Sequence, residues 1–428
     1  MDLADLRARR VVLLGLGADN ESALPEIVAA EPSQVRLVLD DPHAEQPEPG
    51  SLGDSLERID LEAAAGWGEV FVRAPGFPRY APALAGVLER GASMTTPLDL
   101  WVGTHGADRT LVAVTGTKGK STVTTMVGHL ARAHGLRVGV AGNIVHAVFG
   151  DGWDSQAPIV VLEVSSYQAA DLHHVPSLVA LPFLAQDHVS WHGGVRRYIS
   201  DKLRVVRNEG GVVAGGVLVA EESGRAVEEI EALGITPVVV PAPSVEREVP
   251  AQRVRNAALA AAVVSRLGVD QLTDDEVRAT ARMSMPGRLD RCDGPGDLFC
   301  VDDALASNPN ATAAALSWLR GLDRPTIVLL GGQDREVDPA PLAEEAQRWG
   351  GAELRAVALP DTGTDLARVC GIPLVAAVET VEEAVAVALT AAGPGTAVLF
   401  SPAAATPSRL GNWERRSSDF RSALAAAR

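Results

Sequence analysis

The sequence predicts an α/β protein of two or three domains with doubly wound, largely parallel sheets. Short apolar runs alternate with helical segments along the chain, which is the pattern of parallel strands covered by helices. The 428 residues allow two or three domains, at roughly 150 residues each. A hydrophobic fraction of 46% with 22% charged residues is typical of globular proteins and not of disordered ones.

The charge balance and the cysteines restrict the classes of function. There are 55 acidic and 38 basic side chains, for a net charge of −17, which argues against nucleic acid and anionic membranes as partners. The cysteines form no C-x-x-C pair, which fits a reducing compartment and excludes a four-cysteine zinc ribbon. They are Cys292, Cys300 and Cys370. Because the chain shows neither a signal peptide nor an apolar run of about 20 residues, we expect a soluble cytoplasmic protein.

The first hundred residues predict one small α/β domain. A buried strand at Val11–Leu14 leads into Gly15-Leu16-Gly17, as in a Rossmann-like unit. Asn20 holds the last glycine position of G-x-G-x-x-G, so a plain strand-to-helix turn is at least as good an interpretation as a nucleotide site. Further strands are expected at Val35–Leu39 and at Glu69–Val72, which leads into Ala74-Pro75-Gly76.

The next segment predicts a phosphate loop. A strand at Leu111–Val114 precedes Thr115–Thr122, and a helix is expected over Thr124–His134. The loop has the short form G-T-x-G-K-S-T, in which glycines let backbone N–H groups approach phosphate oxygens. Lys120 can reach the β- and γ-phosphates, and the Ser121 hydroxyl can ligate Mg²⁺.

Three later residues leave alternatives open. Glu163 ends an apolar strand, Pro158–Val164, and is equally well interpreted as a Mg²⁺ ligand or as a carboxylate that reaches solvent. His188 and His192 are four apart, but Gly193-Gly194 interrupts a helix, so a zinc pair is a poor interpretation. Lys202, on an expected helix with Tyr198, is by itself best interpreted as a solvated lysine.

The remainder predicts a helix with Asn256 and then a second doubly wound sheet. Asn308-Pro309 should cap a helix that runs to Leu319, and Pro237–Pro250 should be a loop or hairpin. The other expected elements are a helix at Arg253–Leu267 and strands at Phe299–Val301 (followed by Asp302-Asp303), Thr326–Leu330 and Thr396–Ser401.

The order of these motifs resembles the Mur ligases, and most closely the UDP-N-acetylmuramoyl-L-alanine–glutamate ligases. The resemblance runs over nearly the whole chain. It is carried by Thr115–Thr122, Glu163–Gln168, Asp187-His188, Trp191–Gly193, Lys202, Asn256, Pro286–Leu289, Asp302-Asp303, Asn308, Gly331-Gly332-x-Asp334-Arg335, Ser401–Ala403 and Trp413–Arg416.

The resemblance implies three domains and an ATP-dependent ligation in peptidoglycan precursor synthesis. The domains would be a Rossmann-like UDP-sugar domain (1–104), a central P-loop ATPase domain (105–285) and a Rossmann-like C-terminal domain that binds glutamate and closes over the nucleotide (286–428). ATP would phosphorylate the substrate carboxylate, and the glutamate amine would attack the acyl phosphate, which requires cationic groups and Mg²⁺ around the transferred oxygens. The expected partners are UDP-N-acetylmuramoyl-L-alanine, glutamate and ATP, and we expect a monomer.

The resemblance also assigns roles to individual residues. Lys120, Lys202 and His188 would be catalytic. Lys202 would be carbamylated, because a free ammonium, with a pKa of roughly 10.4, repels a metal ion, whereas a carbamate supplies an anionic oxygen ligand. The Mg²⁺ ligands would be Ser121, Glu163, His188 and Lys202. The ATP-binding residues would be Gly116, Thr117, Lys118, Gly119, Lys120, Ser121, Thr122, Asn256, Arg288 and Asp302. The substrate-binding residues would be Gly15, Ala74, Pro75, Gly76, Asn143, Arg335, Ser401, Thr406 and Trp413.

Departures from the family pattern point to the enantiomer of glutamate. The D-glutamate enzymes carry lysines at the positions of Leu305 and Arg335, whereas a branch that adds L-glutamate carries S-S-Y-Q, D-K-L and G-G-x-D-R, all present here. We therefore expect L-glutamate. The alternatives are a D-glutamate ligase and a catalytically weak binding subunit, since Phe183, Ser190 and Gln252 also depart from the pattern.

Overall fold

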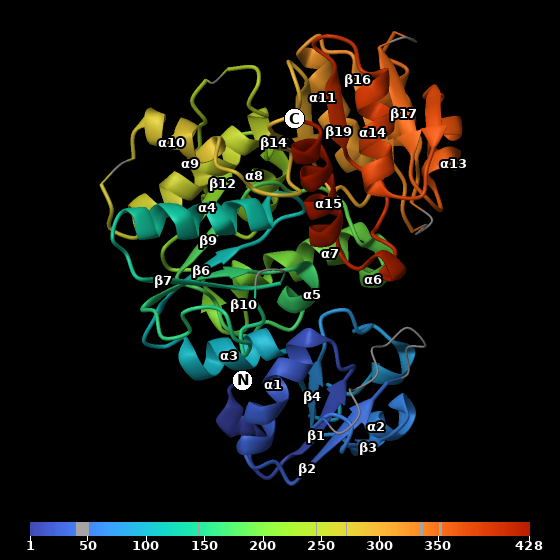
Figure 1. The fold of residues 1–428 in the computed structure, drawn as a ribbon. Helices are drawn as coiled ribbons and strands as arrows, with labels where there is room; N and C mark the ends of the chain where they lie inside the picture. The colour runs from blue at the N-terminus through green and yellow to red at the C-terminus, as the bar shows by residue number, and fades with distance from the viewer. Residues whose placement is uncertain (40–50, 144–145, 245, 271, 334–336, 351–352) are drawn as a thin grey trace. The chain divides into compact units, whose positions relative to one another are not determined.

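Three large sheets carry the described part of the chain, which confirms the predicted α/β class and three-domain fold (Figure 1). The computed structural model describes residues 1–39, 51–143, 146–244, 246–270, 272–333, 337–350 and 353–428. The chain divides into two units. One comprises Met1–Ser244 and Gln252–Ala281, with the first two sheets, and the other comprises Val245–Ala251 and Arg282–Arg428.

The N-terminal sheet has the strand order β3-β2-β1-β4-β5, and all its strand pairs are parallel. Its strands are β1 (Arg10–Leu14), β2 (Gln34–Val38), β3 (Glu57–Arg58), β4 (Val70–Arg73) and β5 (Ser93–Thr95). Its helices are α1 (Ala18–Ala29), α2 (Leu61–Trp67) and α3 (Pro97–His105), with short 3₁₀ turns at Leu3–Leu6 and Pro82–Leu84. The buried Asn20 side chain donates to the Gly15 carbonyl at 2.7 Å, so the residue that breaks the glycine fingerprint fixes the turn between β1 and α1.

The central sheet has the order β13-β12-β9-β6-β8-β7, again with parallel pairs throughout. Its strands are β6 (Thr110–Val114), β7 (Val138–Gly142), β8 (Ile159–Glu163), β9 (Leu178–Leu181), β12 (Val217–Ala220) and β13 (Val238–Val240), and a small hairpin joins β10 (Arg207–Asn208) to β11 (Gly211–Val212). Its helices are α4 (Lys120–Ala133), α5 (Ser166–Ala169), α6 (Val189–His192), α7 (Val195–Lys202), α8 (Gly224–Glu231), α9 (Ala251–Arg266) and α10 (Asp274–Ala281), with a 3₁₀ turn at Leu203–Val205.

The prediction of a loop or hairpin over 237–250 is wrong for its first part. Val238–Val240 form β13, which pairs in parallel with β12. This run of β-branched residues suits an extended edge strand, and the proline that precedes it hid that preference. Val238 and Val239 remain exposed, as expected at the edge of a sheet.

The C-terminal sheet has the order β14-β15-β19-β16-β17-β18. Its strands are β14 (Asp290–Cys292), β15 (Phe299–Asp302), β16 (Thr326–Leu330), β17 (Leu354–Ala358), β18 (Leu374–Ala377) and β19 (Ala397–Phe400). The edge strand β14 is antiparallel to β15, whereas the other pairs are parallel. The helices are α11 (Pro309–Gly321), α12 (Ala340–Ala346), α13 (Gly363–Val369), α14 (Val381–Ala391) and α15 (Trp413–Ala426), with a 3₁₀ turn at Ser408–Leu410. The predicted cap is confirmed, because the Asn308 side chain accepts from the Ala311 N–H.

Both faces of the N-terminal and C-terminal sheets are covered. In β1, Val11 and Leu13 belong to one buried cluster while Val12 and Leu14 belong to another. In β16, Val328 and Leu330 likewise belong to one buried cluster, and Ile327 and Leu329 belong to another. Strands buried on both sides need continuous apolar runs rather than alternation, which is why the runs were visible in the sequence.

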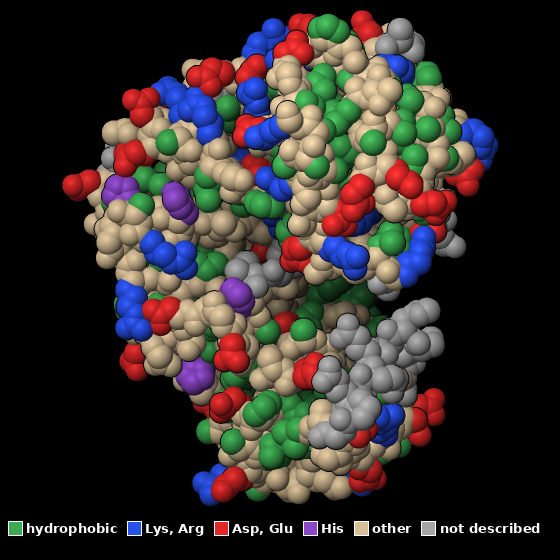
Figure 2. Space-filling model, in the orientation of Figure 1, with side chains coloured by type: hydrophobic (Ala, Val, Ile, Leu, Met, Phe, Trp, Pro, Cys, Tyr) green, Lys and Arg blue, Asp and Glu red, His purple; other side chains and the backbone are tan. Residues whose placement is uncertain are grey.

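The surface is mixed in charge. On the face drawn in Figure 2, arginine and lysine side chains are interspersed with aspartate and glutamate across the described surface. None of the described helices is both long and apolar enough to cross a membrane.

Candidate functional site

The phosphate loop lies between β6 and α4, where parallel strands present their carboxyl ends. Gly116 and Gly119 both have positive φ, at 152° and 86°. A Cβ on Gly119 would lie 2.9 Å from Pro182 Cβ and 3.0 Å from Asn256 Oδ1. The loop therefore requires glycine here, and it brings the predicted Asn256 of α9 against the loop.

Hydroxyl groups fix the rest of the loop. Thr117 Oγ1 lies 2.7 Å from the Tyr198 hydroxyl and donates to the Ala185 carbonyl at 2.8 Å. Thr115 Oγ1 donates to the carbonyl of Val164, just beyond β8. Lys118 is exposed, and Ser121 and Thr122 are buried in the first turn of α4. The hydroxyl groups of Thr115 and Thr117 therefore tie the loop to the neighbouring segments of the central sheet.

Two lysines converge on one carbonyl oxygen. Lys120 Nζ and Lys202 Nζ donate to the Gly116 carbonyl at 3.1 and 3.0 Å. Lys202 is 2% exposed, so its interpretation as a solvated lysine is wrong. Burial, followed by the Lys120 charge, lowers the pKa of Lys202 well below its ordinary value. The chain contains only three lysines, Lys118, Lys120 and Lys202, so two of the three meet at this carbonyl.

Glu163 ends β8 with a fully buried side chain, so the alternative that it reaches solvent is wrong. Its Oε1 accepts from Asn143 Nδ2 at 3.2 Å, whereas the buried Oε2 has no hydrogen-bond partner. A buried carboxylate oxygen without a donor suits a cation. Within the described residues, no group of three or more His, Cys, Asp or Glu side chains could hold a metal, so a cation here would need hydroxyl or lysine-derived oxygens besides.

The two histidines have different surroundings. His188 has a left-handed backbone (φ 48°), and its Nδ1 lies 2.9 Å from the Tyr167 hydroxyl. Burial lowers the pKa of His188, with Asp187 opposing the shift and Lys120 adding to it, which favours the neutral imidazole that a metal requires. His192 is fully buried.

The His192 ring is fully engaged by protein groups. Its Nδ1 lies 2.7 Å from Asp201 Oδ2, and its Nε2 lies 3.0 Å from Ser166 Oγ. Tyr80, from the segment between β4 and the 3₁₀ turn at Pro82–Leu84, donates to the same Asp201 oxygen at 2.7 Å. His192 therefore holds local structure, and Asp201 and Tyr80 were not recognised in the sequence.

The predicted sugar-binding residues lie at the carboxyl ends of β1 and β4. Gly15 has φ 76°, and a Cβ on it would lie 3.3 Å from Ala74 Cβ. The Ala74 N–H donates to the Leu14 carbonyl, and Phe77 donates to Ala74, which closes a turn over Pro75-Gly76. The structure thus brings Gly15 and this turn together.

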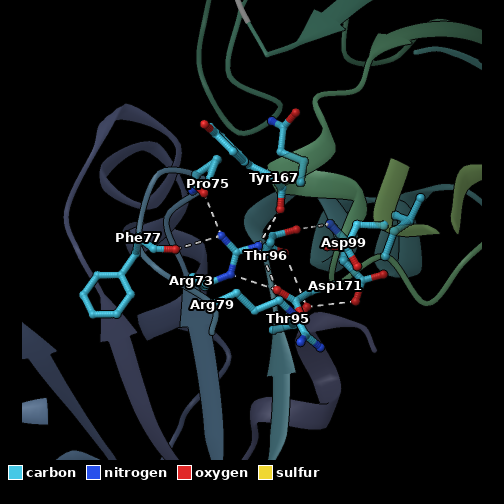
Figure 3. A network of polar contacts seen from close by, with 12 residues as sticks. Arg73, Pro75, Phe77, Arg79, Thr95, Thr96, Asp99, Tyr167 and Asp171 are labelled. Atoms are coloured by element: carbon cyan, nitrogen blue, oxygen red, sulfur yellow. Dashed lines mark hydrogen bonds and ion pairs between the residues drawn. The ribbon is translucent and has the colours of Figure 1, made fainter. Parts of the chain in front are cut away.

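A buried arginine that the sequence analysis missed lies behind this turn (Figure 3). Arg73, the last residue of β4, has no exposed surface. Its Nε donates to Asp171 Oδ2 at 2.8 Å, and its Nη1 donates to the Pro75 carbonyl at 2.7 Å. Further bonds from Arg73 reach the carbonyls of Ala74, Phe77 and Tyr167. An arginine that ends an apolar strand gives little signal, because its partner Asp171 lies 98 residues away.

The C-terminal unit gathers its own predicted residues. The fully buried Asp302 accepts from the Gly287 N–H at 3.0 Å and from Arg421 Nε at 2.8 Å. A Cβ on Gly287 would lie 2.7 Å from the Trp413 ring and 3.5 Å from Leu305 Cγ. The motifs around Gly287, Asp302 and Trp413 are therefore neighbours.

Other predicted residues of this unit differ in how deeply they are buried. Ser401 Oγ donates to Asp303 Oδ2 at 2.9 Å, and burial raises the pKa of Asp303 to about 7. Arg288 and Thr406 are half-buried. Arg335 lies outside the described residues.

A phosphate loop, a buried carboxylate and two convergent lysines define the class of phosphate-loop α/β enzymes that use ATP. Two family models match the chain: the Mur ligase middle domain at residues 114–229, and the Mur ligase glutamate ligase domain at residues 287–404.

Whole-chain relatives agree with these models. A UDP-N-acetylmuramoyl-L-alanine–L-glutamate ligase of Micromonospora is 34% identical and covers 99% of this chain and 98% of its own. A UDP-N-acetylmuramoylalanine–D-glutamate ligase of Rubrobacter xylanophilus is 32% identical, with 96% and 97% covered. The solved UDP-N-acetylmuramate–alanine ligase of Thermotoga maritima has a TM-score of 0.57 at 17% identity, with 98% and 100% covered, and so shares the fold. The chain belongs to the Mur ligase family of ATP-dependent, ADP-forming amide ligases.

Proposed function

We propose that this protein joins L-glutamate to UDP-N-acetylmuramoyl-L-alanine at the expense of ATP. The observation that carries the ligase assignment is the convergence of Lys120 and Lys202 on the Gly116 carbonyl beside the buried Glu163. Glutamate and the UDP-substrate are supported by the names of the whole-chain relatives, of which the Micromonospora and Salinispora tropica proteins are L-glutamate ligases.

The choice of enantiomer has a local argument as well. Leu305 stands where the D-glutamate enzymes carry a lysine, and it packs near Gly287 together with the Trp413 ring. An apolar side chain cannot anchor a carboxylate, so the two carboxylates of glutamate must be held by other groups. We assign Arg335, Ser401, Thr406 and Trp413 to this pocket.

In the reaction, the protein positions two charged reactants and stabilises the transferred phosphoryl group. The loop N–H groups and the Lys120 ammonium hold the ATP phosphates in line with the substrate carboxylate. An acyl phosphate forms and ADP leaves. The amine of glutamate then attacks the acyl carbon, and phosphate leaves with formation of the amide. We assign the remaining ATP contacts to Gly116–Thr122, Asn256, Arg288 and Asp302, and the UDP-substrate contacts to Gly15, Ala74–Gly76 and Asn143.

The residues present fit Mg²⁺, because Glu163 Oε2 is a buried carboxylate oxygen without a hydrogen-bond partner and can ligate a cation. Ser121 and Glu163 would hold one ion and His188 a second, with a carbamylated Lys202 as a further oxygen ligand, and the ions would neutralise charge on the phosphate oxygens. The geometry favours the carbamate. A buried amine near a second ammonium is driven towards its neutral form, which is the form that adds CO₂. We also propose domain limits at 1–104, 105–285 and 286–428.

The deciding experiment measures ADP release with ATP, Mg²⁺, UDP-N-acetylmuramoyl-L-alanine and each enantiomer of glutamate. We expect turnover with L-glutamate that falls by several orders of magnitude in Lys120→Ala. Efficient turnover of D-glutamate with L-glutamate inert would establish the alternative ligase. Absence of ADP with both enantiomers would favour a non-catalytic binding subunit.

A further inference from the structure

Four consecutive carbonyl groups of the Pro75-Gly76 turn, those of residues 74–77, accept hydrogen bonds from the side chains of Arg73 and Trp191. The carbonyls of Ala74, Pro75 and Phe77 accept from Arg73 Nη1, at 3.2, 2.7 and 3.3 Å. The Gly76 carbonyl accepts from the indole Nε1 of Trp191 at 3.2 Å. Two side chains therefore engage all four of these carbonyl groups.

The orientation of these carbonyls determines where the N–H groups point. In a trans peptide the carbonyl and the following N–H point in opposite directions, and the structure has no cis peptide among its described bonds. Because the Pro75 carbonyl points to Arg73, the Gly76 N–H points away from it. Pro75 and Pro78 have no N–H, and those of Ala74 and Phe77 are used within the protein. Gly76 thus offers the one unused backbone donor of the described turn, 74–78, and a Cβ there would meet nothing within 4 Å.

The Nε and Nη2 groups of Arg73 bind Asp171 and Tyr167. Asp171 Oδ2 lies 2.8 Å from both Nε and Nη2 of Arg73, and the remaining Nη2 hydrogen bonds to the Tyr167 carbonyl. All five N–H groups of this guanidinium therefore have acceptors. Arg79 Nε donates to the other Asp171 oxygen at 2.6 Å. Figure 3 shows the Arg73 side chain between the turn, Tyr167 and Asp171.

A lysine could not do the same. Its ammonium has three hydrogens and no planar fork, so it cannot serve the carboxylate and four carbonyls together. The Asp171 carboxylate also offsets the cost of burying a charge with no exposed surface. The arrangement is therefore specific for arginine.

We infer that Arg73, locked by Asp171, and Trp191 are positioning residues that orient the Pro75-Gly76 turn so that its free N–H receives the diphosphate of the UDP-substrate. The inference rests on the proposed function, which assigns Ala74–Gly76 to the UDP-substrate; the anionic diphosphate is the part of that substrate that a backbone N–H donor suits. It adds that the affinity for the diphosphate depends on residues that do not touch it. The same guanidinium donates to the carbonyl of Tyr167 in α5, which follows β8 and Glu163, so the turn and α5 share one anchor.

The test measures the affinity of the full-length protein for UDP, uridine and ATP in three variants. Trp191→Phe removes the indole donor and keeps an aromatic ring, and Arg73→Lys removes the fork. Trp67→Phe is the matched control, because Trp67 lies in the same unit, stacked under Arg36 at 4.3 Å and away from the turn. A lost neutral hydrogen bond changes an equilibrium by roughly two- to tenfold.

We expect the dissociation constant for UDP to rise roughly three- to tenfold in Trp191→Phe and more than about tenfold in Arg73→Lys. The affinities for ATP and uridine should stay within about twofold of those of the unmodified protein. The melting temperature of Trp191→Phe should stay within about 2 °C of the unmodified protein's. If the unmodified protein does not bind UDP, the proposed function fails and takes this inference with it. If it binds UDP but Trp191→Phe keeps its affinity, or loses ATP and uridine equally, the inference alone is overturned.

Discussion

Replacing Gly119 by alanine tests the phosphate loop through its backbone. Gly119 has φ 86° and ends the loop as the N-cap of α4. A residue with a Cβ costs about 1–2 kcal/mol in this left-handed region. The new methyl would also lie 2.9 Å from Pro182 Cβ and 3.0 Å from Asn256 Oδ1, and such overpacking costs about 1–3 kcal/mol. The two costs together predict a loss of about 2–5 kcal/mol in the free energy of unfolding.

Gly17 provides the control for this experiment. It is the N-cap of α1 in the same kind of strand-to-helix turn, but its φ is −58° and a Cβ on it would meet nothing within 4 Å. Gly17→Ala should therefore change stability by no more than about 0.5 kcal/mol. Thermal unfolding should show Gly119→Ala melting at least about 4 °C lower, at about 2–4 °C per kcal/mol. The KM for ATP should rise as well. If Gly119→Ala melts like Gly17→Ala and keeps its KM, the loop does not have the conformation described.

Three further expectations follow from the site. Lys202→Ala should be nearly inactive and partly restored by short-chain carboxylic acids, which can replace the carbamate oxygen; full activity without them would exclude the carbamate. Labelled ¹³CO₂ should give one carbamate resonance that Lys202→Ala removes and Lys118→Ala keeps. L-Glutamate should be preferred by at least roughly tenfold in kcat/KM, about 1.4 kcal/mol, and Arg335→Lys should reduce that preference, which a comparison of both enantiomers will measure. Burial raises the pKa of Asp303 to about 7, so its contribution to stability is present below about pH 4 and is lost as pH rises through 7. Denaturation of Asp303→Asn across this range should lack that decline, and parallel pH profiles would contradict the assignment.

The features that sequence reasoning found are those encoded over a few adjacent residues. The phosphate loop was recognised because strand, glycines, Lys120 and helix are contiguous. The buried strands were recognised because both faces of the N-terminal and C-terminal sheets are covered, so that their strands are continuous apolar runs. Strand limits were shifted by a residue where polar groups flank them, as at β2, predicted as Val35–Leu39 and observed as Gln34–Val38.

Burial of single charged residues was not encoded locally. Lys202 belongs to a short polar helix, and only the fold reveals that its ammonium reaches the Gly116 carbonyl, 86 residues away. Glu163 was ambiguous for the same reason, because the depth of a strand end depends on the loops that cover it. Arg73 was missed altogether, because its partners Asp171 and Tyr167 lie 98 and 94 residues further along the chain.

The distribution of lysine and arginine along the chain fits the proposed carbamate at Lys202. All other side chains with a permanent positive charge are arginines, which keep their charge when buried, as Arg73 does against Asp171. Lysine alone can lose its proton under burial, and a lost proton is what carbamate formation at Lys202 needs. Lysine occurs only at Lys118, Lys120 and Lys202. The first two belong to the phosphate loop, and the third donates to the loop carbonyl of Gly116. Arginine does not lose its proton and cannot form the carbamate. Lys202→Arg should therefore stay inactive, whereas Lys202→Ala with an added carboxylic acid should recover part of its activity.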